Sequence, residues 1–191
     1  GEEKEYQINE LLQQAENHFM QNNFDKAGEL YIAAIKIDKK CVPAYKGLAE
    51  TYSAKGNKEE AFQTYDFLSR LMPDDDALLV KLGENAEEQG KIEQAIHYYE
   101  KATTINDSLS PRFYHLAELL MKADQPEVAI EAAKQAVDLE PKNPKYLDLL
   151  IEIAIICGIK DEAVKAFEEL RLVNPENQKL AELKEKIEKI G

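Results

Sequence analysis

Apolar and small residues recur along this chain with a period of 34 residues. One position is alanine in every period: Ala27, Ala61, Ala95, Ala129 and Ala163. The positions four, seven and ten residues after each alanine are apolar or aromatic throughout, for example Tyr31, Ala34 and Ile37. Residues with this spacing lie on one face of an α-helix. The pattern therefore predicts an amphipathic helix in the second half of each period.

A second helix is predicted ahead of each of these helices. Its apolar face also has a helical spacing, as in Tyr45, Leu48, Ala49 and Tyr52 of the second period. A small residue lies twelve places before the recurring alanine in four periods, and Ile151 takes that place in the fifth. Gly56, Gly90 and Gly158 fall between the two predicted helices, where a residue in the left-handed conformation would end the first one.

The periods, counted from Ile8, form contiguous blocks, and each block is predicted to be an antiparallel helix pair. The blocks are residues 8–41, 42–75, 76–109, 110–143 and 144–177. The recurring small residues allow two helix backbones to approach to about 8 Å. Because one helix pair cannot bury its apolar face alone, the pairs are predicted to stack into a solenoid.

The segments outside the blocks have separate interpretations. Residues 1–7 are interpreted as a lead-in, and Gly1 as a scar of tag removal. Residues 178–191 are predicted to form a helix with an apolar stripe made of Leu180, Leu183, Ile187 and Ile190. With charged residues around that stripe, the helix is expected to cap the last helix pair. The alternative is that the stripe forms a dimer seam between two chains.

This pattern resembles the tetratricopeptide repeat (TPR) family over residues 8–177. The resemblance rests on the period, the small residue of the first helix, the alanine and aromatic of the second helix, and the prolines Pro73, Pro141 and Pro175 that close three blocks. It implies an all-α fold, a right-handed solenoid of antiparallel helix pairs. It also implies that partner segments bind along the concave face, which the first helices line.

The composition favours a folded protein and disfavours several classes of partner. The formal net charge is −13, and such a surface repels nucleic-acid backbones and anionic membranes. Hydrophobic residues make up 44% of the chain, which offsets the entropy cost of folding. No stretch approaches the roughly 20 apolar residues that a membrane span requires. Cys41 and Cys157 form no disulfide framework, so a reducing, cytoplasmic location is expected.

No catalytic or metal-binding pattern is found in the sequence. His18, His97 and His115 occupy unrelated places in the repeat and lack the spacing of metal ligands. The acidic run from Asp74 to Asp76 lacks the spacing of a calcium-binding loop and is interpreted as the N-terminal cap of a helix. We therefore expect that the protein is not an enzyme and uses no cofactor or metal ion.

By resemblance to the family, the groove residues lie beside the small packing residue of each first helix. The candidate peptide-binding residues are Leu12, Glu16, Phe19, Met20, Lys46, Glu50, Val80, Glu84, Glu87, Tyr114, Glu118, Met121, Lys122, Asp148, Glu152, Ile155 and Ile156. Glutamate directly follows the packing position in every block, at Glu16, Glu50, Glu84, Glu118 and Glu152. These carboxylates either bind a ligand or bond neighbouring helices, and the sequence favours neither role.

The expected partner is a protein segment with basic or amphipathic character. In the best-known groove of the family, a clamp of lysine, asparagine and arginine holds the C-terminal carboxylate of a partner. Asparagine of that clamp has the position that Glu16 and Glu50 have in this chain. Because two carboxylates there would repel an acidic tail, an acidic tail is rejected as the ligand. The leading hypothesis is a monomeric scaffold that captures a segment of another protein. The alternatives are a regulatory arm of a larger protein, for example a signalling protein, and a scaffold that assembles with itself.

Overall fold

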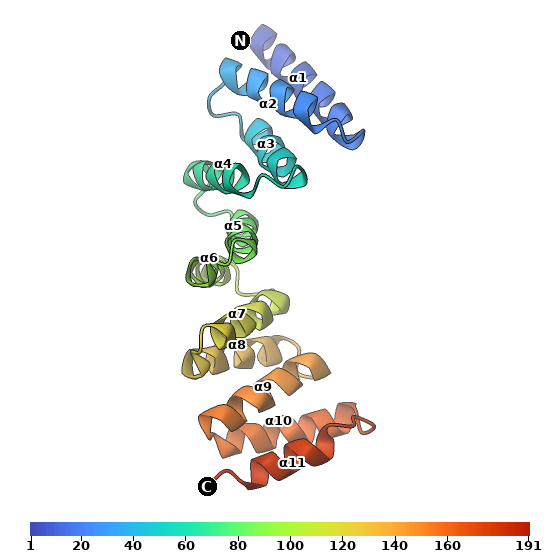
Figure 1. Cartoon of the computed structure of the whole chain (residues 1–191), viewed down its shortest axis with the longest axis vertical. Coiled ribbons are helices and arrows are strands. Elements are labelled where there is room, and N and C mark those ends of the chain that lie inside the picture. The colour runs from blue at the N-terminus through green and yellow to red at the C-terminus, as the bar shows by residue number, and fades with distance from the viewer. The chain divides into compact units, whose positions relative to one another are not determined.

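The computed structural model describes all residues from 1 to 191, and the fold is all-helical (Figure 1). The helices are α1 (Glu2–Met20), α2 (Phe24–Ile37), α3 (Val42–Ala54), α4 (Lys58–Leu71), α5 (Asp76–Glu88), α6 (Ile92–Ile105), α7 (Ser110–Lys122), α8 (Pro126–Leu139), α9 (Pro144–Cys157), α10 (Lys160–Val173) and α11 (Leu180–Glu188). The chain forms two compact units, Gly1–Tyr98 (unit 1) and Tyr99–Gly191 (unit 2). The all-α fold class predicted from the sequence is confirmed.

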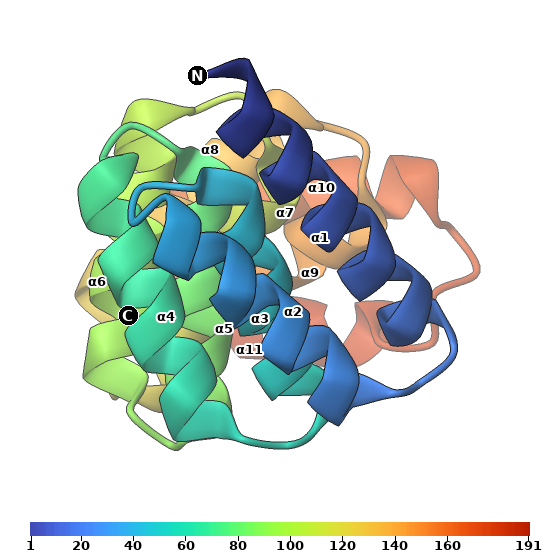
Figure 2. The same ribbon diagram turned by 90° about the horizontal axis from the view of Figure 1, so that it is seen from above.

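Consecutive helices form antiparallel pairs within each unit. In unit 1, α1 lies beside α2, and α3 pairs with α4 in the same way (Figure 1, Figure 2). In unit 2 the pairs are α7 with α8 and α9 with α10. The helix pairs that the spacing of apolar residues predicts are therefore present in both units.

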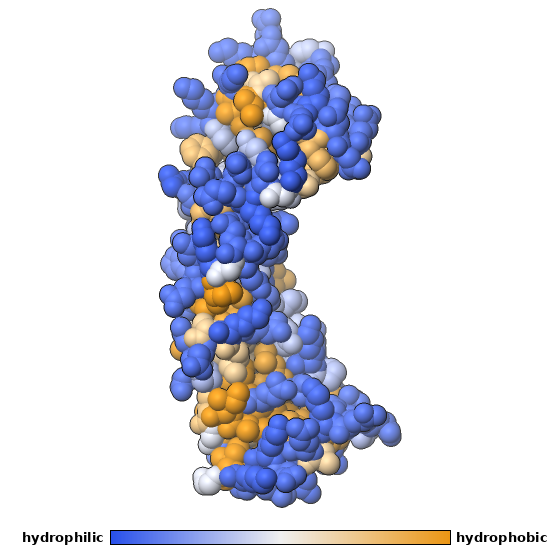
Figure 3. Space-filling view, viewed as in Figure 1, coloured by the Kyte–Doolittle hydropathy of each residue, from blue (hydrophilic) through white to orange (hydrophobic).

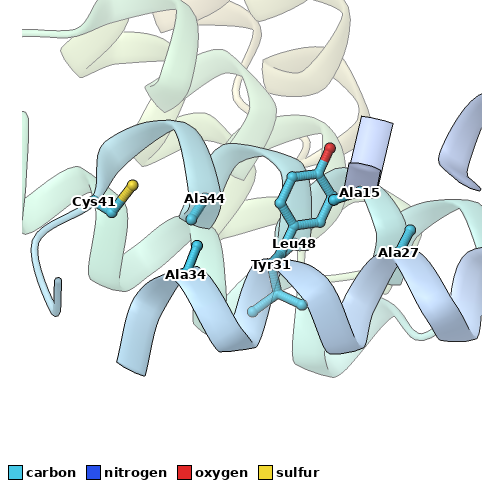
Figure 4. Packing of buried hydrophobic residues seen from close by; sticks show 7 residues of the cluster. All are labelled: Ala15, Ala27, Tyr31, Ala34, Cys41, Ala44 and Leu48. Carbon is cyan, nitrogen blue, oxygen red and sulfur yellow. The ribbon is translucent and has the colours of Figure 1, made fainter. Parts of the chain in front are cut away.

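The recurring alanines lie at the centres of the helix contacts. Each has a side chain with 0% exposure: Ala27, Ala61, Ala95, Ala129 and Ala163. The aromatic residue four places later is buried as well, at Tyr31, Tyr65, Tyr99 and Phe167. Figure 4 shows the ring of Tyr31 close to the small side chain of Ala15 and to Leu48. A small residue such as Ala15 thus leaves space that a neighbouring ring fills.

The first helix begins earlier than the repeat pattern suggests. Residues 2–7, interpreted as a lead-in, form the first turns of α1, which starts at Glu2. Glu2, Glu3 and Glu5 lie in that first turn, where negative charge is favourable to the helix dipole. Tyr6 is 66% exposed, so this extension adds little to the apolar core.

Every turn between paired helices contains one residue in the left-handed conformation. The φ angles are 81° at Gly56, 76° at Gly90 and 69° at Gly158, as predicted. The structure adds Asn22 with φ 63° and Asp124 with φ 58°, which lie at the same position of the repeat. Asparagine and aspartate tolerate this conformation better than other residues with a Cβ atom, which explains why the turn persists without glycine.

Glycine at these two turns is expected to stabilise the protein. Asn22→Gly and Asp124→Gly should each raise the free energy of unfolding by about 0.5–1 kcal/mol, because glycine adopts positive φ without steric cost. Gly56→Ala should have the opposite effect of similar size, and its new Cβ atom would meet no atom within 4 Å, so only backbone strain is tested. Chemical denaturation of the three variants measures the differences. If the free energy of unfolding were unchanged in all three variants, the positive φ angle assigned to these turn residues would be contradicted.

Polar caps fix the starts of two helices that carry candidate site residues. Asp75 Oδ1 accepts a hydrogen bond of 3.1 Å from the Leu78 amide at the start of α5, which confirms the cap predicted in the acidic run. Asn143 Oδ1 accepts one of 3.0 Å from the Lys145 amide at the start of α9. Such caps satisfy amide groups that have no partner within the helix.

The two cysteines form no disulfide bond with each other. Cys41 is buried, Cys157 is half-buried, and both are free thiols. No helix combines the length and the apolar character needed to cross a membrane.

Candidate functional site

Three predicted site residues of unit 1 meet around one hollow. This hollow, here called the unit-1 hollow, has a volume of about 300 Å³ and is lined by Phe19, Glu50, Ser53, Tyr65, Lys81, Glu84, Asn85 and Glu88. Phe19 comes from α1, Glu50 from α3 and Glu84 from α5, so the first helices of three consecutive pairs supply them. The visible surface of α3 to α5 is mostly hydrophilic, in agreement with this lining (Figure 3).

Buried tyrosines lie between the repeated glutamates of unit 1. Burial raises the pKa of Tyr31, and the carboxylates of Glu16 and Glu50 raise it further. Burial also raises the pKa of Tyr65, a hydrogen bond from Ser53 lowers it, and the nearby Glu50 and Glu84 carboxylates raise it. Each tyrosine therefore senses the glutamates of two successive first helices. The row of carboxylates predicted from the sequence is interleaved with phenol groups.

The glutamates of this row carry uncompensated charge. No cation forms an ion pair with Glu16, Glu50 or Glu84 in unit 1. All three side chains are exposed to solvent, so they remain available to a ligand. None of the printed ion pairs of unit 1 joins one of these glutamates to a neighbouring helix, and their role in ligand binding or in helix contacts stays a prediction.

The predicted apolar anchors of unit 1 differ in their accessibility. Leu12 and Phe19 are partly buried against the core of the unit, and the Phe19 ring lies edge-on to Phe24 with centroids 5.2 Å apart. Met20 is 74% exposed. Val80 is half-buried. Part of the apolar surface predicted for a ligand is thus used within the chain.

In unit 2 the candidate residues of α7 and α9 form an aromatic and acidic cluster. The rings of Tyr114 and Tyr146 lie 5.1 Å apart, and Lys145 Nζ lies 4.6 Å from the centre of the Tyr114 ring. Burial raises the pKa of Tyr114, and the carboxylates of Glu118, Asp148 and Glu152 raise it further. Tyr114 therefore lies among the candidate carboxylates of two successive first helices.

The α9 carboxylates face the C-terminal helix of the same chain. Lys179 Nζ lies 3.4 Å from Asp148 Oδ2, and the other oxygen of Asp148 is buried without a hydrogen-bond partner. Burial and the Asp148 charge raise the pKa of Glu152, whereas the charges of Lys179 and Lys186 lower it. The part of unit 2 that the sequence assigned to a partner is thus partly occupied by the chain itself.

Apolar contacts hold α11 in this position. Leu183 is 4% exposed and Ile187 is 5% exposed, and the helix lies against α9 and α10. Lys186 also forms an ion pair of 2.9 Å with Glu182 on the same helix. The stripe expected to cap the last pair or to form a dimer seam is directed in this structure at the chain's own helices.

Several residues that complete these clusters were not predicted as site residues from the sequence. They are Tyr31, Tyr65, Lys81 and Asn85 in unit 1, and Tyr146 and Lys179 in unit 2. The spacing places the recurring aromatic on the apolar face of the second helix and gives no role to the hydroxyl group of the tyrosines. A tyrosine, at a position where phenylalanine would fill the same space, was the feature of the sequence that could have indicated a polar contact of the ring.

A second hollow in unit 2 was also not predicted. It has a volume of about 320 Å³ between α8, α9 and α10, and its apolar wall includes Val137, Leu147 and Leu150. Its lining also contains lysines and acidic residues, and Lys134 Nζ lies 3.5 Å from Glu162 Oε1. No group of three or more histidine, cysteine, aspartate or glutamate side chains in the structure is arranged to hold a metal ion.

Comparison with protein families agrees with this architecture. A family model described as "Tetratricopeptide repeat" matches residues 18–82 and 86–153, more than half of the chain. A curated relative, the protein CTR9 homolog of Arabidopsis thaliana, is 27% identical over 163 residues; the match covers 82% of this chain and 15% of that protein. The chain thus spans only a small part of this relative.

Solved structures share the fold at low sequence identity. A crystal structure of MamA has a TM-score of 0.73 and 20% identity, with 92% of this chain and 94% of that chain covered. YrrB, described as a TPR protein with an unusual peptide-binding site, has a TM-score of 0.70 and 15% identity, with 92% and 90% covered. A tetratricopeptide repeat protein from Parabacteroides merdae has a TM-score of 0.73 and 16% identity, with 97% and 73% covered.

Proposed function

Because the chain belongs to the tetratricopeptide repeat family, whose fold is typically a non-catalytic scaffold for protein–protein interaction, we propose that it binds a basic or amphipathic segment of a partner protein. The segment would lie on the face of the first helices that carries the repeated glutamates. The uncompensated charge of Glu16, Glu50 and Glu84 in unit 1 is the observation that carries this proposal. Carboxylates without cations attract a segment that supplies them.

The contacts of α11 support the same ligand chemistry. This amphipathic helix buries Leu183 and Ile187 in apolar contacts. Lys179 forms an ion pair with Asp148 of α9, and the charges of Lys179 and Lys186 lower the pKa of Glu152. A partner helix with the same combination would suit the equivalent face elsewhere in the chain. Peptide binding by YrrB, a TPR protein with an unusual peptide-binding site and the same fold, is compatible with such a role.

Charge and apolar contact are expected to contribute differently to binding. The glutamates are exposed, so each ion pair would contribute only about 0.2–1 kcal/mol. Most of the affinity would come from exposed or half-buried apolar groups, such as Met20 in unit 1 and Tyr114 or Ile156 in unit 2. The charges would mainly accelerate association and make it dependent on salt.

A peptide array probed at two salt concentrations tests this proposal. We expect the wild type to prefer peptides in which lysine or arginine alternates with apolar residues, and to lose much of that preference at high salt. Replacing Glu50, Glu84 and Glu118 together by lysine should abolish the preference for basic peptides, because the attraction becomes repulsion. Tyr114→Ala should mainly accelerate dissociation.

A charge-matched variant provides the control for the array. Glu29→Lys, Glu100→Lys and Glu131→Lys change the net charge equally at exposed positions of the second helices α2, α6 and α8. The control should retain the peptide profile of the wild type. A wild type that prefers acidic peptides, or two triple variants with the same profile, would contradict the proposal.

A further inference from the structure

We propose that the unit-1 hollow is a subsite for one lysine side chain of the partner segment. Its ammonium group would donate hydrogen bonds to Glu50 and Glu84, and its methylene chain would lie against Phe19 and Tyr65. This inference rests on the function proposed above and names the group that the partner must supply. It concerns a single side chain, because a volume of about 300 Å³ is at the small end of ligand pockets.

The charged groups around the hollow favour a cation. The lining contains the three carboxylates of Glu50, Glu84 and Glu88 and one positively charged side chain, that of Lys81. None of these four side chains forms an ion pair, so the hollow keeps an excess of negative charge. A lysine ammonium carries three donors and one positive charge, which matches carboxylate acceptors that form no ion pair within the chain.

The buried walls of the hollow favour a side chain that is apolar along its length. Tyr65 is 7% exposed, and it lines the hollow together with Glu50 and Glu84. Phe19 is held in place by its edge-on contact with Phe24. Lysine buries its methylene groups against such rings while its charged end stays among polar groups, and an ammonium near a ring face gains further attraction.

Unit 2 provides an independent observation of the same chemistry. Glu152 occupies the repeat position of Glu50 and Glu84. One turn before it, Lys179 of the same chain forms an ion pair of 3.4 Å with Asp148, and the charges of Lys179 and Lys186 lower the pKa of Glu152. These two lysines are seven residues apart, or about two helical turns, and Leu183 lies between them on the buried side of α11. The structure thus contains an example of a lysine-bearing amphipathic helix that packs beside the first helix carrying this repeat position and pairs with a carboxylate one turn away.

Binding of a peptide with the sequence of residues 176–190 to the full chain tests the subsite. A second peptide carries Lys179→Gln and Lys186→Gln. The proteins are the wild type, a Glu50→Gln/Glu84→Gln variant, and a Glu29→Gln/Glu131→Gln control with the same change of charge. We expect the Glu50→Gln/Glu84→Gln change to weaken binding of the lysine peptide about tenfold and to leave the glutamine peptide nearly unaffected. The control should bind both peptides as the wild type does.

The outcomes separate the subsite from the general function. Equal weakening for both peptides, or no weakening for either, would overturn the lysine subsite. The same holds if the wild type does not bind the lysine peptide. If array peptides still bind and Tyr114→Ala weakens them, the proposed scaffold function stands without this subsite. If no array peptide binds, the scaffold function itself fails. Glutamine keeps the size of glutamate at exposed positions, and thermal melting verifies that both variants are folded.

Discussion

Replacing Gly47 with alanine is expected to destabilise the protein by about 3 kcal/mol, the upper part of the range for overpacked cores. A Cβ atom at Gly47 of α3 would lie 2.2, 2.3 and 2.7 Å from three atoms of the Tyr31 ring. That ring is 8% exposed and packs with Ala15 and Leu48, so it cannot move aside without disturbing the contact of α2 with α3 (Figure 4).

Gly28 of α2 provides a matched control in the neighbouring helix. A Cβ atom at Gly28 would meet Thr51 Cγ2 at 3.8 Å and Leu48 Cδ1 at 4.0 Å, which are ordinary contacts. Because glycine weakens a helix interior, Gly28→Ala should stabilise the protein by about 0.5–1 kcal/mol. Denaturation curves of both variants give opposite signs if this packing is right. Adding Tyr31→Leu should restore part of the stability that Gly47→Ala removes. A Gly47→Ala variant as stable as the wild type would disprove the close contact.

Deleting residues 178–191 is expected to expose the apolar face of α9 and α10 and to lower the stability of unit 2. Leu183 and Ile187 are 4% and 5% exposed, and burying such a side chain contributes about 1.5–3 kcal/mol. The deletion also removes Lys179, which forms an ion pair with Asp148, and Lys186, whose charge acts on Glu152. The carboxylates of Asp148 and Glu152 then repel each other with less compensation. Sedimentation is expected to show association of the truncated chain, and denaturation a lower midpoint.

Two point variants separate the role of the stripe from that of helix length. Leu183→Ala should reproduce most of the loss of stability, whereas Lys184→Ala at an exposed position should change it by no more than about 0.5 kcal/mol. If the stripe instead forms a dimer seam, the wild type would sediment as a dimer, and the truncated chain would be a monomer with unchanged stability of its helix pairs.

The candidate site could be predicted only in part from the sequence. The resemblance to the family, together with the period of the chain, pointed to Glu50, Glu84 and Phe19, which the structure brings to one hollow. It did not indicate Tyr65, Lys81 or Lys179, because these lie on second helices, one turn away from the repeated position, or outside the repeats. A period identifies equivalent positions, but it does not say which side chains of different helices meet.

The helix pairs themselves follow from the sequence, because helical spacing of apolar residues is a local property and its repetition at 34 residues makes each pair bury the same face. The left-handed turns follow where glycine marks them, at Gly56, Gly90 and Gly158. Asn22 and Asp124 adopt the same turn, although their residue types alone do not require it.

Tertiary structure alone decided the features that depend on two distant segments. Nothing local distinguishes Gly47 from Gly28, since both are glycines inside helices, yet the ring of Tyr31 excludes a Cβ atom at one and space remains at the other. The apolar stripe of residues 178–191 allowed either a cap or a dimer seam, and the burial of Leu183 and Ile187 within unit 2 depends on the shape of α9 and α10. Packing depends on the distances between side chains of separate helices, and these distances are set only when the helices have assembled.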